Sequence, residues 1–175
     1  MSELNSRCLD AFSLWLANLA EDTRVIVDAV ADDSLPVEVR RPLAGALNYL
    51  FKSLDLIDDG IEGIGYLDDA FVMRVAAADA GEAAPEGIQK LAADRGLIAE
   101  FLDDLEPKFA QFVLGLSQSS VRGRSVEQVV SDAMTRDELL GDVRGWASRY
   151  SQPAFTKDEK HLVKLRSFLQ AKLPG

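Results

Sequence analysis

The amino-acid sequence predicts an all-α fold, a single-domain helical bundle of about seven helices. Three observations predict it. Apolar residues recur at steps of three and four along most of the chain, no segment alternates as a strand does, and prolines and glycines separate the periodic segments. A length of 175 residues is enough to bury a substantial core. We therefore expect residues 1–175 to form one domain.

Three helices are expected in the first half of the chain. Apolar spacing predicts one long or kinked helix over about 4–31. Pro36 suits the first turn of a second helix over 36–52, because proline lacks only an N–H that has no partner there. A third helix is expected over about 66–80, after a segment rich in glycine and aspartate.

A regular apolar stripe follows, with steps that alternate between three and four as in a heptad seam. Pro107 predicts a kink or break near Leu105-Glu106. Because other amphipathic helices are available to cover the stripe, we expect it to be buried within the protomer. Its members are Ile88, Leu91, Arg95, Ile98, Leu102, Leu105, Phe109, Phe112 and Leu116.

The last third contains a polar linker and two further helical regions. Residues 117–125 form the linker, and Ser125 with Gln128 has the spacing of a capping box. Helix is expected from there to about Tyr150, and Thr156 is expected to cap the last helix. The last helix is basic, so its side chains either form a solvated face or dock on the protein's own acidic segment.

Charge and cysteine content exclude several functions. The net charge is −10 at pH 7, which opposes binding to nucleic acids and to anionic membrane surfaces. No stretch reaches the roughly 18 apolar residues of a membrane helix. Cys8 is the single cysteine and lies on an apolar helix face, so a buried free thiol is expected. These features favour a reducing cytoplasm.

The most informative segment is Leu54–Asp69, LDLIDDGIEGIGYLDD. It contains six acids and three glycines but no basic residue, and apolar side chains alternate with the acids. Clustered carboxylates either cap helices or hold a cation, and these alternatives imply different proteins. The six acids are Asp55, Asp58, Asp59, Glu62, Asp68 and Asp69.

A calcium-binding EF-hand loop does not fit this segment. With Gly60 at loop position 6, Ile57 and Tyr66 occupy positions 3 and 12, where oxygen ligands are required. The run Asp58-Asp59-x-x-Glu62 has the look of the aspartate-rich motif of isoprenoid synthases, which binds magnesium. The glycines that interrupt and follow it disfavour the necessary helix.

Helix capping is the interpretation that we favour. Asp68 and Asp69 fall in the first turn of an expected helix, where free N–H groups and the helix dipole favour negative charge. The alternative is a divalent-metal enzyme acting on a phosphate ester or diphosphate. Its ligands for Mg²⁺ or another divalent cation would be Asp55, Asp59, Asp68 and Asp69.

Residues 36–80 resemble the bacterial YkvA-like domain of unknown function. The family signature runs approximately Y-L-x-S-P-x-D-L-I-P-D-x-I-P-G-x-G-Y-L-D-D, and the chain matches it from Tyr49 to Asp69. Ser53, Asp58 and Glu62 stand where the family has proline, whereas the four acids named as possible ligands match family acids. The resemblance implies a short helical hairpin about a stiff turn, with no established activity.

These observations predict a cytoplasmic, bacterial, non-enzymatic domain for interaction or scaffolding. It needs no cofactor, and its protein partner is not named by the sequence. Self-association into a homo-oligomer is compatible with this role. His161 is the single histidine and is expected at the surface near a helix start, not in a zinc site.

Overall fold

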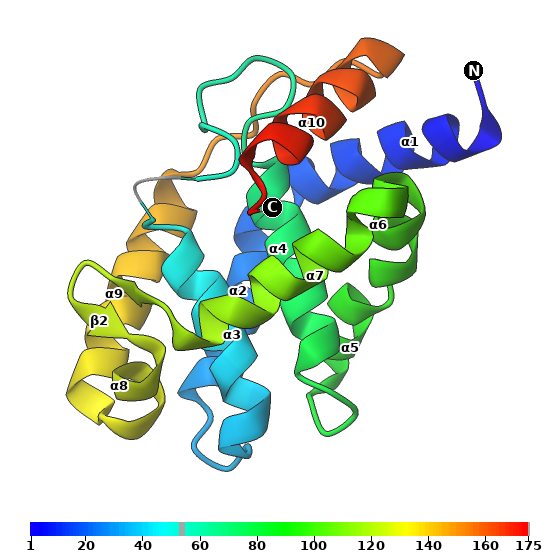
Figure 1. Cartoon of the computed structure of the whole chain (residues 1–175). Coiled ribbons are helices and arrows are strands. Elements are labelled where there is room, and N and C mark those ends of the chain that lie inside the picture. Colours follow the sequence, from blue (N-terminus) through cyan, green and yellow to red (C-terminus); the bar gives the residue numbers. More distant parts are fainter. Residues whose placement is uncertain (53–54, 175) are drawn as a thin grey trace.

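Helices of unequal length pack around one central helix in the computed structural model, which describes residues 1–52 and 55–174 (Figure 1). Ser53, which stands where the family signature has proline, and Leu54, the first residue of the acidic segment, lie outside the described residues, as does Gly175. The elements are α1 (Glu3–Ala17), α2 (Leu19–Ala31), α3 (Val37–Tyr49), α4 (Leu67–Asp79), α5 (Glu86–Ala92), α6 (Arg95–Leu102), the 3₁₀ turn η1 (Asp103–Leu105), α7 (Glu106–Gly115), the 3₁₀ turn η2 (Leu116–Gln118), β1 (Ser120–Val121), β2 (Arg124–Ser125), α8 (Val126–Ser131), α9 (Ala133–Arg149) and α10 (Glu159–Lys172). The all-α prediction is confirmed, and β1 and β2 form a two-residue antiparallel hairpin.

Helix α4 lies at the centre of the bundle (Figure 1). It packs against α1, α3, α5, α6 and α7, and every residue from Leu67 to Ala77 is buried. A helix that is buried on all sides has no solvated face, so each of its polar side chains needs a partner inside the protein. Asp68, Asp69 and Arg74 are the charged residues on which this requirement falls.

The hairpin expected within 36–80 is present. Helix α3 packs along α4, and residues between them form a connector, whose described parts are 50–52 and 55–66. Gly45 lets α3 approach η2 closely, because a Cβ there would lie 2.9 Å from the carbonyl oxygen of Leu116. The hairpin thus sits inside the fold and is not a separate appendage.

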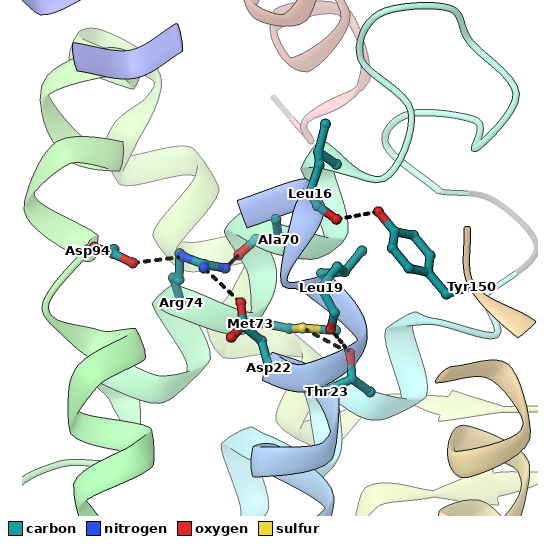
Figure 2. Close-up of polar contacts among 9 residues, drawn as sticks. All are labelled: Leu16, Leu19, Asp22, Thr23, Ala70, Met73, Arg74, Asp94 and Tyr150. Atoms are coloured by element: carbon teal, nitrogen blue, oxygen red, sulfur yellow. Dashed lines mark hydrogen bonds and ion pairs between the residues drawn. The ribbon is translucent and has the colours of Figure 1, made fainter. Parts of the chain in front are cut away.

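The first expected helix is divided into α1 and α2 at Asn18. Tyr150 donates a hydrogen bond from its hydroxyl to the carbonyl oxygen of Leu16 at 2.7 Å, close to this break (Figure 2). One turn into α2, the Thr23 hydroxyl donates to the carbonyl oxygen of Leu19 at 2.7 Å. The break between α1 and α2 therefore lies close to a hydrogen bond from a residue 134 positions later in the chain.

Seven of the nine members of the apolar stripe are buried within the single chain, as expected, and Arg95 and Phe112 are half-buried. The stripe runs through α5, α6 and α7 and is interrupted twice. One interruption lies between α5 and α6, and the other lies at Asp103, where φ is +51° and α6 ends. Arg95, the polar member of the stripe, pairs with Glu106 at 3.2 Å. Pro107 lies in the first turn of α7, so the expected break falls just before it.

The C-terminal third corrects two expectations. The polar segment 117–125 is not a plain linker, because it contains η2 and the β1–β2 hairpin. The capping box of Ser125 and Gln128 is confirmed. Helix α10 is capped by Asp158 and not by Thr156, since the Asp158 side chain accepts a hydrogen bond from the Lys160 amide at 2.9 Å.

Cys8 is a fully buried free thiol, and burial raises the pKa of that thiol to about 11. Within residues 1–52 and 55–174, no helix combines the length and the apolar character needed to cross a membrane.

Candidate functional site

Three carboxylates meet where the connector joins α4. Asp59 lies in the connector, and Asp68 and Asp69 lie in the first turn of α4. Each offers an oxygen, and these oxygens all lie within 4.8 Å of one another. Asp68 and Asp69 are 0% and 3% exposed, whereas Asp59 is an exposed residue. We call these three residues the carboxylate cluster.

The connector reaches the cluster through a tight turn. The amide of Gly65 donates to the carbonyl oxygen of Ile61 at 2.9 Å. A Cβ on Gly65 would lie 2.1 Å from the carbonyl oxygen of Asp59, so only glycine permits this approach. Tyr66 has φ of +68°, an unfavourable conformation for a residue with a side chain. This geometry ties the position of Asp59 to the turn that leads into α4.

Tyr49 links the connector to Asp68. Its hydroxyl donates to Asp68 Oδ2 at 2.6 Å and accepts from the Leu56 amide at 2.8 Å. The Ile57 amide also lies 3.4 Å from Asp68 Oδ2. Tyr49 is a functional residue that sequence patterns alone do not single out, although it matches the first tyrosine of the YkvA-like signature. That position in the signature was the signal that could have indicated it.

Burial and mutual repulsion disfavour the ionised form of these carboxyl groups. Burial raises the pKa of Asp68, and burial together with Asp68, Asp59 and Asp55 raises the pKa of Asp69 well above its usual range. Burial, followed by the charges of Asp68 and Asp59, raises the pKa of Asp55 to about 7. Burial and Asp58 raise the pKa of Asp59.

Two buried carboxyl oxygens, one in the carboxylate cluster and one beside it, lack a hydrogen-bond partner. They are Asp68 Oδ1 and Asp55 Oδ1. In the part of the chain that the structure describes, none of the salt bridges includes Asp55, Asp59, Asp68 or Asp69. Lys52 is the basic residue whose charge acts on Asp55. An anionic oxygen in this position is costly unless it is protonated or coordinates a cation.

Residues 42–74 match the family described as "Protein of unknown function (DUF1232)". The match lies within the segment that resembles the YkvA-like domain, and it includes all four acids predicted as possible ligands. No curated protein and no solved structure matches the chain. The DUF1232 segment is thus similar to a family to which no activity is assigned.

The last residue of the DUF1232 segment, Arg74, shows how the same helix balances a buried charge (Figure 2). Arg74 is 3% exposed, and its guanidinium pairs with Asp22 at 2.9 Å and Asp94 at 3.0 Å. It also donates to the carbonyl oxygen of Ala70 at 3.1 Å and lies 4.3 Å from the ring centroid of Trp15. Every part of this cation meets a complementary group, in contrast to Asp68 and Asp69 on the preceding turns.

The structure places the predicted site residues as follows. Asp68 and Asp69 lie in the first turn of α4, as expected, but α4 has no side-chain cap hydrogen bond, and Asp68 accepts from Tyr49 and from the Ile57 amide instead. Their burial was not expected. Asp59 joins them, and Asp55 lies close enough for its charge to affect Asp69. Asp58 and Glu62 are exposed and stay outside the cluster.

Proposed function

We propose that the DUF1232 segment of this protein binds one divalent cation through Asp59, Asp68 and Asp69, with Asp55 beside them. The observation that carries the proposal is Asp68 Oδ1, a fully buried oxygen without a hydrogen-bond partner in a cluster of acids. A cation would supply that partner and would neutralise the repulsion that raises the pKa values of the cluster.

The donor set favours a hard cation. All of the candidate ligand atoms are carboxylate oxygens, which suit Mg²⁺, Ca²⁺ or Mn²⁺. Zinc sites are built mainly from cysteine and histidine, and neither residue type belongs to the cluster. Mg²⁺ usually keeps several water ligands, and the exposed side of Asp59 offers room for them.

We further propose that the ion is structural and that the protein is a non-enzymatic interaction or scaffold domain. A metal that activates a phosphate ester must keep ligand positions free for the substrate. Here Asp68 and Asp69 are almost fully buried, and the hydroxyl of Tyr49 already occupies one oxygen of Asp68. A phosphate ester would therefore have access only beside Asp59. We also propose a cytoplasmic location for this domain, whose single cysteine, Cys8, is a buried free thiol.

Thermal unfolding with and without divalent ions tests the cation site. At 100 times the dissociation constant, a ligand of the folded state adds about 2.7 kcal/mol to the free energy of unfolding. For a chain of this size that corresponds to an increase of roughly 5–10 °C in the melting temperature. Mg²⁺, Ca²⁺ and Mn²⁺ are each compared with a chelator, and calorimetric titration gives the stoichiometry.

Two variants and one control separate the cation site from helix capping. Asp68→Asn and Asp69→Asn keep an oxygen but remove one charge, so they should abolish the ion-dependent gain and stabilise the chelated protein. Asp58→Asn is the matched control, since Asp58 is an exposed neighbour outside the cluster. It should keep the full gain. If no ion changes the melting temperature of the wild type, or if Asp68→Asn keeps the gain, the proposal is wrong.

A further inference from the structure

The turn that carries Asp59 also contacts the last helix. Lys164 of α10 donates from Nζ to the carbonyl oxygen of Glu62 at 2.9 Å. The His161 ring lies directly against Gly63, because a Cβ on Gly63 would lie 2.4 Å from His161 Nε2. Figure 1 shows the connector beside α10 at the same end of the bundle. Of the two alternatives for the basic last helix, docking on the acidic segment occurs at Lys164, through a backbone carbonyl.

From these contacts we infer that cation binding at the carboxylate cluster controls how firmly α10 is held on the bundle. This inference rests on the proposed cation site and adds a regulatory consequence to it. With the ion bound, the turn is fixed and α10 is docked. Without the ion, the turn loosens and α10 is released more often.

The turn between Asp59 and Gly65 connects the carboxylate cluster to the residues that contact α10. Asp68 and Asp69 belong to the buried helix α4, whereas Asp59 is exposed and belongs to the connector. Repulsion within the cluster is therefore relieved most easily by movement of Asp59 toward solvent. Because Gly65 contacts the carbonyl of Asp59, that movement also displaces the turn that includes Glu62 and Gly63.

Helix α10 has further attachments, among them contacts with the end of α6 and with η1. Arg166 donates to the carbonyl oxygens of Phe101 at 3.1 Å and Leu102 at 2.6 Å, and it pairs with Asp104. The buried face of α10 consists of Leu162, Leu165 and Leu169, followed by Leu173. These contacts remain when the connector moves, so the ion should change the opening equilibrium of α10 without detaching the helix permanently.

Hydrogen exchange measured by mass spectrometry on the full chain tests this inference. The probes are Mg²⁺ and Ca²⁺, each compared with a chelator. Amides of α10 should exchange on the order of tenfold faster in the chelator, which is within the usual range of coupling between two sites. Helix α2, which has no hydrogen bond to the connector among the described residues, should change less than about twofold.

Variants on α10 leave the proposed ligands intact. The double variant His161→Ala/Lys164→Met removes both contacts with the turn, so α10 should exchange fast with and without the ion. It should still show the ion-dependent gain in melting temperature. Lys160→Met is the matched control, because Lys160 is an exposed lysine on the same helix. It should behave as the wild type does.

The outcomes distinguish the two proposals. A gain in melting temperature with unchanged exchange in α10 would overturn the coupling and leave the cation site standing. A double variant whose α10 still responds to the ion would also overturn the coupling. If neither melting temperature nor exchange responds to any of the ions, the cation site itself is wrong.

Discussion

The phenol of Tyr49 offers the most direct test of how the cluster is held. Tyr49→Phe removes one hydroxyl from a side chain that is 1% exposed and leaves the ring in place. Two buried groups then lose a partner, namely Asp68 Oδ2 and the Leu56 amide. A hydrogen bond to a charged group contributes about 1.5–3 kcal/mol, and an unsatisfied buried donor costs about 1–3 kcal/mol. The Ile57 amide remains near Asp68, so we expect a total loss of about 3 kcal/mol.

Chemical unfolding in urea at fixed pH and ion concentration measures this loss. A decrease of about 3 kcal/mol corresponds to roughly 6–12 °C in melting temperature for a chain of this size. Tyr66→Phe is the control, because no hydrogen bond of the Tyr66 hydroxyl occurs among the described residues. Because Tyr66→Phe keeps the half-buried ring and removes no hydrogen bond, it should alter stability by about 0.5 kcal/mol or less.

The pH dependence of the loss adds a second criterion. The hydrogen bond from Tyr49 lowers the pKa of Asp68 and thereby stabilises the ionised carboxylate. The loss should therefore be larger at pH 8, where Asp68 is more often ionised, than at pH 5. If Tyr49→Phe costs less than about 1 kcal/mol, or no more than Tyr66→Phe, the phenol does not hold the cluster and our reasoning fails.

Three further predictions concern charge and packing. Because the pKa values of Asp55 and of the cluster are raised in the folded state, the folded protein binds more protons, so without ions its free energy of unfolding should fall as the pH rises from about 4 to about 8. A saturating concentration of divalent ion should reduce that decrease. If urea unfolding curves without ions are identical at about pH 4 and about pH 8, the predicted pH dependence is wrong. Leu102→Lys places a charge at a fully buried position and should lower the free energy of unfolding by at least about 3 kcal/mol. Light scattering should show the same mass for this variant as for the wild type. A stable wild-type dimer that becomes a folded monomer in the variant would refute burial of the stripe within one chain. Arg74→Met leaves Asp22 and Asp94 without their cation and should destabilise the fold by about 3–5 kcal/mol in urea, against less than about 1 kcal/mol for Arg7→Met at an exposed pair.

Local sequence patterns predicted the helices well where the signals are local. The expected helix over about 66–80 corresponds to α4, because glycines precede it and an apolar run follows. The capping box at Ser125 was also predictable, since both partners lie within one turn. At the last helix the prediction of Thr156 as the cap was wrong by two residues, because aspartate caps helices as well as threonine does and the Asp158 side chain meets the Lys160 amide.

Long-range contacts account for what the sequence could not predict. The division at Asn18 accompanies a hydrogen bond from Tyr150, which is 134 residues from its acceptor. Convergence of Asp59 with Asp68 depends on the close approach at Gly65 and on the phenol of Tyr49. Burial of Asp68 and Asp69 depends on helices that pack against α4 and come from both earlier (α1, α3) and later (α5, α6, α7) parts of the chain. The residue types were visible in advance, whereas their shared, buried location was not.

The contacts between the two ends of the described chain bear on the order of folding during synthesis. Helix α1 packs against α10, Asp10 pairs with Lys157 at 2.8 Å, and Asn5 donates to Glu159, which is 154 residues away. At ribosomal rates of about 5–20 residues per second, α1 waits roughly 7–30 s before this partner emerges. During that interval one side of α1 is uncovered on the ribosome. A holding chaperone that recognises apolar helix faces would therefore find a binding site in α1 until α10 is made.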